Sequence, residues 1–179
     1  MTKTMSLVLE MERIANALGA EQGDASQVSL PSVAEKIAQS LGVRAGEVGI
    51  LAVSLRWRHL RFLVPEELKK IGSIPLSSNL ALAARTARDS RPEIENNFAA
   101  ARHTTVFEGV RLKGEPAEAI QKLISAPILL DGKVIGVIQI SRKGTTPASA
   151  GPDFTADDLG KILALCKPLA KLLRHIPDE

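Results

Sequence analysis

Two apolar segments joined by an Asp-Gly dipeptide constrain the fold of this chain more than any other feature. Residues 124–130 and 133–140 consist largely of Ile, Val and Leu, and Asp131-Gly132 separates them. Asp-Gly is typical of a type I′ turn, because both central residues of that turn need a positive φ. Apolar side chains fall on both faces of the second segment. The sequence therefore predicts a β-hairpin whose two faces are both covered near the turn.

Shorter apolar segments earlier in the chain predict further strands. Residues 48–55 are apolar on both faces and are expected to form an interior strand. Residues 60–64 are expected to return beside it as a second hairpin, and residues 74–76 to form a short third strand. Pro127 has no N–H to donate, so we expect it at a strand start or at an edge position.

The N-terminal part of the chain predicts two amphipathic helices. Apolar residues recur at helical spacing in residues 5–18 and again in residues 33–41. Ser32 and Glu35 have the spacing of a capping box, which would start the second helix at Ser32. Gly42 is expected to end this helix, because glycine adopts the left-handed conformation that often follows a last turn.

The middle of the chain predicts shorter helices around an irregular stretch. Residues 79–88 have an apolar face, and Ser77 or Ser78 is expected to cap that helix. Residues 93–113 show no regular pattern, and a loop of this length inside a domain is usually functional or mobile. Residues 115–121 are expected to form a short helix that a proline introduces.

The last helix has the clearest start signal. Thr155 and Asp158 form a variant capping box, and Phe154 is placed to pack as a hydrophobic staple. Pro168 is expected to kink the helix, because it removes a backbone donor. Leu165 and Leu172 lie outside the predicted buried stripe, which leaves apolar surface for contact with another chain. That stripe is Leu159, Ile162, Leu163, Cys166, Leu169, Ala170 and Leu173.

Length, cysteine content and hydropathy limit the class of protein. A chain of 179 residues suits one domain, and its apolar content is sufficient for a core. Cys166 is the only cysteine, so an intramolecular disulfide and a cysteine-rich zinc site are both excluded. The sequence shows no signal peptide and no apolar run of about 20 residues that would cross a membrane. We therefore expect a soluble, cytoplasmic protein without a metal site.

The net charge of +3 is spread along the chain. The densest basic stretch, residues 56–61, lies at a predicted turn and contains Arg56, Arg58 and Arg61. A nucleic-acid groove needs a longer basic stripe, usually with aromatic side chains for stacking. A solvated polar turn explains this stretch, so neither a nucleic acid nor a membrane is an expected partner.

The C-terminal half resembles a GAF domain. Residues 125–140 read SAPILLDGKVIGVIQI, and after a polar loop residues 154–159 read FTADDL. GAF domains characteristically close with such a hairpin and such a helix start, and the order of the earlier predicted elements also agrees. The resemblance covers about residues 30–175, and it is weakest over residues 90–115.

The resemblance implies an α+β fold. A central antiparallel sheet would have the N- and C-terminal helices on one face, while short helices and loops on the other face would enclose a ligand pocket. Residues 1–28 would be an N-terminal helix and loop that could serve dimerisation, residues 29–176 the GAF-like domain and residues 177–179 a tail. The implied function is small-molecule sensing in signal transduction, with a separate partner protein as the output and no cofactor that the sequence identifies.

One binding pattern of the family is only partly present. Members that bind cyclic nucleotides carry Asn-Lys, then after a spacer a Phe, then after three intervening residues Asp-Glu. The matching positions here are Ser141-Arg142, Phe154 and Asp158-Leu159, so the Asn and the Glu are replaced and a cyclic nucleotide is disfavoured. Arg142 and Asp158 are instead expected to form a structural ion pair.

Candidate ligand-binding residues lie in two places. The first is the predicted helix start at residues 77–79, where unpaired N–H groups attract anions, although ordinary capping explains the same residues. The second is the irregular stretch, whose polar side chains could line a pocket. A histidine bonded to loop backbone is the alternative interpretation of that stretch. The candidates are Ser77, Ser78, Asn79, Asn96, Asn97, His103 and Glu108.

Three classes of function follow. A ligand-binding sensor is favoured, and a dimerisation or protein-interaction module without a ligand is the alternative. An enzyme is expected least, because no nucleophile–base pair, phosphate-binding loop or dinucleotide-binding motif is present. Some GAF proteins reduce free methionine sulfoxide with paired cysteines, and Cys166 alone cannot form the disulfide that this chemistry needs. We therefore expect no catalytic residue.

Overall fold

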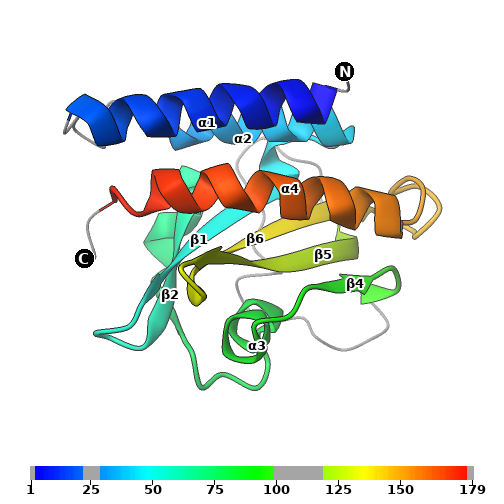
Figure 1. Ribbon diagram of the computed structural model, residues 1–179. Coiled ribbons are helices and arrows are strands. Elements are labelled where there is room, and N and C mark those ends of the chain that lie inside the picture. Colours follow the sequence, from blue (N-terminus) through cyan, green and yellow to red (C-terminus); the bar gives the residue numbers. More distant parts are fainter. Residues whose placement is uncertain (1–2, 22–28, 99–118, 177–179) are drawn as a thin grey trace.

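The protein is built on one antiparallel sheet whose strands differ in length. The computed structural model describes residues 3–21, 29–98 and 119–176. Six strands follow one another across the sheet in the order β3-β2-β1-β6-β5-β4 (Figure 1). Their bounds are β1 Val48–Ser54, β2 His59–Val64, β3 Ser73–Pro75, β4 Glu93–Glu95, β5 Ala119–Leu130 and β6 Lys133–Gly144.

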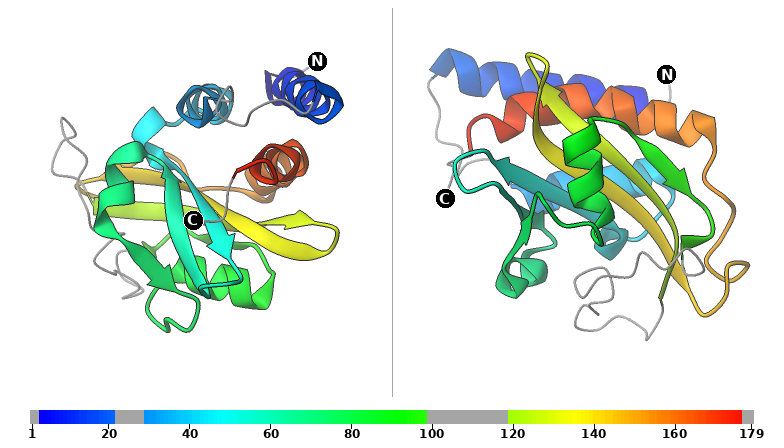
Figure 2. Two further views of the ribbon diagram at one scale, coloured as in Figure 1. Left: turned by 90° about the vertical axis from the view of Figure 1, so that its left-hand side faces the viewer. Right: turned by 90° about the horizontal axis from the view of Figure 1, so that it is seen from below.

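Helices cover both faces of the sheet. Three long helices lie on one face and the shorter α3 lies on the other, as the end-on view in Figure 2 shows. The long helices are α1 (Lys3–Glu21), α2 (Leu30–Leu41) and α4 (Ala156–Leu173), and α3 spans Leu82–Asp89. Two short 3₁₀-helices, η2 (Ala45–Glu47) and η3 (Glu66–Ile71), flank β1 and β2. In the described part of the chain, no helix combines the length and the apolar character that a membrane span requires.

The hairpin that the sequence predicts most strongly is confirmed. Asp131 and Gly132 have φ values of 51° and 80°, which are the positive angles that a type I′ turn needs. β5 and β6 are longer than expected, and Ala119 pairs with Gly144 at their far end. The pairing of β5 with β4 ends at Ser125, two residues before Pro127. At Pro127, β5 therefore has β6 as its one described neighbour. The expected edge position of Pro127 is therefore confirmed.

An aliphatic core joins the three long helices to the sheet. Helix α2 contacts β1 and β2, and α4 contacts β5 and β6. Helix α1 lies above both of these helices and buries Leu7 and Met11 between them. Two ion pairs hold α1 in place, because Glu10 binds Lys36 of α2 and Glu12 binds Lys171 of α4. The N-terminal helix is therefore part of the same core as the sheet.

The position of α1 corrects one prediction about α4. Leu165 and Leu172 were expected to leave apolar surface outside the buried stripe, but they are 0% and 1% exposed. Leu163, expected inside that stripe, is 41% exposed. The reason is that α4 is covered on two sides, by the sheet and by α1, and a single-stripe pattern accounts for one of them.

Some element boundaries also differ from those expected. Ser29, not Ser32, caps α2, and its side chain accepts the Ser32 N–H. Helix α3 begins at Leu82 rather than residue 79. Gln121, predicted to end a short helix, lies in β5. Ala119 and Ile120 of that predicted helix lie in β5 as well, and its residues 115–118 lie outside the described residues.

The burial of Leu165 yields a direct test of this helix layer. Leu165→Ala should lower the free energy of unfolding by about 2–5 kcal/mol, because it leaves a cavity between α4 and its neighbours. Leu163→Ala, the same substitution in the same helix, should change it by less than about 0.5 kcal/mol. Urea unfolding followed by circular dichroism measures both values. Equal losses for the two variants would contradict this packing.

Candidate functional site

The two faces of the sheet differ in chemistry at their centre. On the face toward the long helices, the buried positions of the hairpin are aliphatic, as at Ile138 and Ile140. On the face toward α3, Val137 packs against Ala83 and Ala84 in a second apolar cluster. Two strand positions beside that cluster are polar and buried, Ser125 and Gln139. At the centre of the β5–β6 hairpin, the α3 face therefore combines apolar surface with buried hydrogen-bonding groups.

Ser125 and Gln139 belong to a continuous set of hydrogen bonds. They are direct partners across β5 and β6, and Gln139 Nε2 lies 3.2 Å from Ser125 Oγ. Ser125 Oγ lies 2.7 Å from Oγ1 of Thr86 on α3, and Thr86 Oγ1 lies 3.0 Å from the Leu82 carbonyl oxygen. Thr86 and Ser125 are both 0% exposed, and Gln139 is 7% exposed. This set links α3 to the middle of the sheet.

Small residues and an ion pair set the position of α3. Ala83 and Ala84 let the helix approach β5 and β6 closely, and both are fully buried. The Arg85 guanidinium makes two hydrogen bonds to the Glu93 carboxylate, at 3.0 and 2.6 Å, and thereby joins α3 to β4. The ion pair thus directs Arg85 to this edge strand.

The residues predicted at the start of α3 act in the turn before it. Ser78 Oγ accepts hydrogen bonds from the N–H groups of Leu80 and Ala81, at 3.3 and 3.1 Å. Ser77 and Asn79 are exposed. The prediction that Ser77 or Ser78 caps this helix is therefore wrong, because the N-cap residue of α3 is Ala81, which has no side-chain cap, and the Ser78 hydroxyl is used within the preceding turn.

The two asparagines predicted in the irregular stretch have separate environments. Asn96 Nδ2 donates to the Phe154 carbonyl oxygen at 3.0 Å, and Asn96 Oδ1 accepts the Phe154 N–H at 2.8 Å. Both ends of its amide are thus used to join β4 to the start of α4. Asn97 is exposed, and its N–H donates to Glu95. His103 and Glu108 lie outside the described residues.

The structure gives Arg142 and Asp158 other partners than each other. The Arg142 guanidinium lies over the Phe154 ring, 4.4 Å from its centroid, and donates to the Pro152 carbonyl oxygen. The Asp158 carboxylate accepts from the N–H and the hydroxyl of Thr155 and completes the capping box of α4. The predicted ion pair between Arg142 and Asp158 is therefore wrong. The Asp158 carboxylate binds the N-terminus of α4 instead.

One further carboxylate is buried, and its partners are structural. Glu47 is 6% exposed, and its oxygens accept the Arg44 N–H at 2.8 Å and the Lys143 N–H at 2.7 Å. The Arg44 guanidinium adds a hydrogen bond at 3.2 Å. Glu47 therefore fastens η2 to β6 and is satisfied by these contacts.

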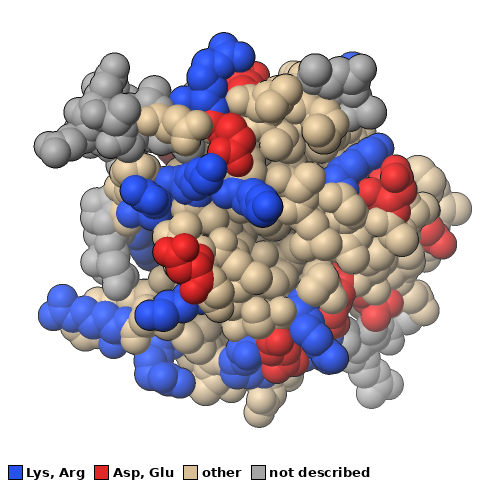
Figure 3. Space-filling view, viewed as in Figure 1, with Lys and Arg blue, Asp and Glu red and all other residues tan. Residues whose placement is uncertain are grey.

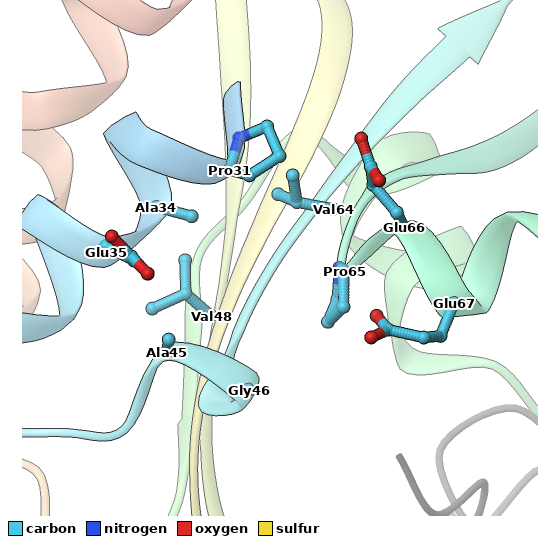
Figure 4. Close-up of a pocket in the computed structure, with 10 residues that line it drawn as sticks. All are labelled: Pro31, Ala34, Glu35, Ala45, Gly46, Val48, Val64, Pro65, Glu66 and Glu67. Carbon is cyan, nitrogen blue, oxygen red and sulfur yellow. The ribbon is translucent and has the colours of Figure 1, made fainter. Parts of the chain in front are cut away.

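A surface groove of about 340 Å³ lies between α2 and η3 (Figure 4). Its floor is apolar, and the Glu35 and Glu67 side chains approach it from opposite walls. Both of these acidic residues are exposed, and no buried polar side chain faces the groove. Within the described ranges, no group of metal-binding side chains is present. The groove is thus a less specific candidate than the α3 face.

Basic side chains gather at another end of the molecule. Lys and Arg are concentrated at the lower left of Figure 3, the side on which the turn between β1 and β2 lies. Arg56 and Arg58 in this turn are exposed, and the Arg56 guanidinium lies 4.8 Å from the centroid of the Trp57 ring. The turn is therefore solvated, as the sequence analysis expects.

Cys166 lies in the helix layer, away from the α3 face. Its side chain belongs to the aliphatic core, and it is 7% exposed. Burial raises the pKa of the Cys166 thiol to about 12. A thiol in this state is scarcely ionised at neutral pH, and the thiolate is the reactive form. Cys166 is therefore a packing residue, as expected.

Neither family models nor curated proteins match this sequence. Solved structures do resemble it. The GAF domain of an Acinetobacter phosphoenolpyruvate-protein phosphotransferase has a TM-score of 0.65 and 17% identity, over 96% of this chain and 92% of that chain. Residues 122 to 287 of a methyl-accepting chemotaxis protein give 0.57 and 16%, over 84% and 92%. Free methionine-R-sulfoxide reductase from Neisseria meningitidis, solved with its substrate, gives 0.62 and 16%, over 96% and 89%.

These likenesses define the fold of the chain. It has the α+β fold of GAF domains, with a six-stranded antiparallel sheet, as the sequence resemblance implied. Proteins with this fold include regulatory domains and a reductase, so the fold alone does not identify the function of this chain. The function has to be inferred from its site.

Sequence reasoning missed Thr86, Ser125 and Gln139. A signal for two of them is present, because Ser125 and Gln139 are polar residues inside otherwise apolar strand segments. Their direct pairing does not follow from the Asp131-Gly132 turn alone, because the register shifts by one residue between Ile128 and Leu129, and without that shift Ser125 would face Ile138. Thr86 had no comparable signal, because its contact with Ser125 depends on how α3 docks.

The thiol of Cys166 gives a pH-dependent test of this burial. The unfolded thiol ionises near its usual pKa of 9.0, while the folded thiol stays neutral up to about 12. The native state is therefore penalised as pH rises from about 9 to 12, and its stability below pH 9 is unaffected. The free energy of unfolding of the wild type, minus that of Cys166→Ala, should fall by about 1.4 kcal/mol between pH 8 and pH 10. A difference that does not change with pH would contradict the burial.

Proposed function

We propose that this protein is a cytoplasmic sensor or regulatory domain that binds a small molecule on the α3 face of its sheet. In this proposal a separate partner protein receives the signal. The observation that carries the proposal is the buried polar set Thr86, Ser125 and Gln139 within an apolar surface. Ligand sites in proteins typically have this composition, a mainly apolar wall with a few fixed polar groups.

The chemical asymmetry of the sheet supports this choice of face. Polar side chains in a core weaken a protein unless every hydrogen-bonding group has a partner. At the same depth the helix face is aliphatic, with Ile124 and Ile138 at the positions adjacent to Ser125 and Gln139. The centre of the sheet therefore does not require polar residues, and a binding role explains why they occur at these positions of the α3 face.

A reductase function is less well supported by this chain. The likeness to a methionine-R-sulfoxide reductase concerns the fold. Reduction of a sulfoxide by thiols needs an accessible thiolate and a second thiol to complete a disulfide. Cys166 is the single cysteine of the sequence, and it is buried on the opposite side of the sheet from α3. Binding without turnover is accordingly the proposal.

A homodimer through the helix layer is a second candidate, and it is compatible with ligand binding. Leu165 and Leu172, which first suggested it, are buried within the chain. Other apolar side chains remain exposed on these helices, Leu9 of α1 at 50% and Leu163 of α4 at 41%. Helices α1 and α4 lie side by side, so the exposed residues belong to one layer (Figures 1 and 2).

A thermal-shift screen of nucleotides, amino acids and organic acids tests ligand binding. A compound present at about 100 times its Kd should stabilise the protein by about 2.7 kcal/mol, which raises the Tm by about 5–10 °C. Hydrogen exchange then locates the site, and protection should appear in α3 and in β6 around Gln139. Protection confined to α2 and η3 would assign the compound to the surface groove. A screen without any stabilising compound would count against the proposal.

Native mass spectrometry tests the second candidate. If the helix layer is the interface, the wild type should be a dimer, and Leu9→Lys together with Leu163→Lys should make it a monomer, because charges replace apolar contacts. Leu129→Lys is the matched control, since Leu129 is 43% exposed at the turn end of the β5–β6 hairpin, outside these helices. A monomeric wild type, or a dimer that survives both helix substitutions, would exclude this interface.

A further inference from the structure

We propose that the Gln139 side-chain carbonyl is a hydrogen-bond acceptor reserved for a ligand, so that the α3 face selects molecules that present an N–H or O–H group. This inference rests on the proposed function and specifies the ligand chemistry of the same site. It follows from the direction of the hydrogen bonds among Leu82, Thr86, Ser125 and Gln139, taken one bond at a time.

The direction is set first at α3. The Leu82 carbonyl oxygen can only accept, and Thr86 Oγ1 lies 3.0 Å from it. A threonine hydroxyl has one hydrogen to donate. That hydrogen is used on Leu82, so Thr86 Oγ1 acts as an acceptor in its other contact.

The direction then passes to the sheet. Ser125 Oγ lies 2.7 Å from Thr86 Oγ1, and since Thr86 has no second hydrogen, Ser125 must donate in this bond. Ser125 Oγ has lone pairs left, and the group facing it must be a donor. The Gln139 amide nitrogen meets this requirement at 3.2 Å. A reversed amide would place two acceptors against each other, so the hydrogen bonds themselves fix the orientation of Gln139.

This arrangement leaves the side-chain amide oxygen of Gln139, Oε1, without a donor among these residues. Its nitrogen is directed to Ser125, and Oε1 has no hydrogen-bond partner in the described part of the chain. Gln139 is 7% exposed, so water has little access to this oxygen. Buried polar atoms in folded proteins nearly always have a partner, and an unpaired one calls for an explanation. A ligand that donates to Oε1 supplies it.

The neighbouring strand leaves room beside Gln139. Gly49 of β1 is the direct partner of Gln139, and it is partly exposed. A methyl group built at Gly49 would meet Phe62 Cε1 at 3.6 Å and the main-chain carbonyl oxygen of Gln139 at 3.8 Å, which are ordinary contacts. The β1 backbone at Gly49 is thus partly exposed next to Gln139, and the buried Phe62 ring lies beside it.

These features define the ligand class. The ligand offers an amide, amine or hydroxyl hydrogen to Gln139 and an apolar surface to Phe62 and its neighbours. A carboxylate or phosphate is disfavoured at this point, because an anion would face the oxygen of an amide dipole. Arg85, the basic side chain of α3 nearest in sequence to Thr86, already binds Glu93.

Two probes that differ only in whether their ring nitrogen bears a hydrogen or a methyl group test the proposal. 2-Piperidone and N-methyl-2-piperidone have the same ring, and only the first has an N–H. Titrations followed by NMR of ¹⁵N-labelled protein report on the Gln139 side chain and on β6. The expected result is that 2-piperidone binds the α3 face about tenfold more tightly than its N-methyl analogue, which corresponds to one hydrogen bond.

The variants assign the preference to Gln139. Gln139→Met keeps the length of the side chain and removes the acceptor, so the preference for the N–H probe should disappear. Gln39→Met is the matched control, because Gln39 lies exposed on α2, and it should retain the preference. Equal affinity of the two probes in the wild type, a preference that survives Gln139→Met, or no binding of either probe at β6 would overturn the inference. The thermal-shift screen judges the proposed function independently of these outcomes.

A measurement without any probe separates a ligand acceptor from a structural one. If Oε1 has no partner inside the protein, Gln139→Met removes one hydrogen bond, from Nε2 to Ser125, and should lower the Tm by clearly less than Ser125→Ala does. Ser125→Ala should lower the Tm, because Thr86 and Gln139 both lose a partner. A decrease for Gln139→Met as large as that for Ser125→Ala would show that the protein itself uses the acceptor, and it would overturn the inference.

Discussion

Two-sided burial of the β5–β6 hairpin is the constraint on which the rest of this structure depends. Strand β6 lies between β1 and β5, so its backbone is satisfied on both edges. Its side chains alternate between the helix layer, where Ile138 and Ile140 are fully buried, and the α3 face, where Val137 is. Removing either layer would expose half of a strand that has little polar surface. Both layers are therefore needed for the sheet to be stable in water.

The sequence was most informative where a local signal and the global fold agree. The Asp131-Gly132 turn and the Thr155 capping box are set by neighbouring residues, and both were found as predicted. Predictions failed where burial depends on a distant element. Leu165 is buried because α1 lies on α4, and no periodicity within α4 records that contact. Arg142 likewise stacks on Phe154 rather than pairing with Asp158, since the helix cap takes the carboxylate.

The same distinction holds for the candidate site. Ser125 and Gln139 are recognisable in the sequence as polar positions in apolar strands, and the hairpin register pairs them. The third member, Thr86, is brought to them by the docking of α3, which depends on Ala83, Ala84 and the ion pair between Arg85 and Glu93. The hairpin itself can be predicted from its turn, but the register that pairs Ser125 with Gln139 also depends on the shift between Ile128 and Leu129. The polar positions are therefore visible in the sequence, whereas their pairing and the docking of α3 require the structure.

The location of this polar set also bears on how a signal would leave the domain. Gln139 lies in β6 between Ile138 and Ile140, whose side chains enter the core beneath α4. The same strand therefore contacts the proposed ligand on one side and the helix layer on the other. Protein cores are close-packed and resist small displacements, so a shift of β6 at Gln139 cannot occur without a response from the helices above it. The ion pairs of Glu10 and Glu12 extend that response to α1, which makes the outer helix layer the part of the molecule where ligand binding and partner binding can be coupled.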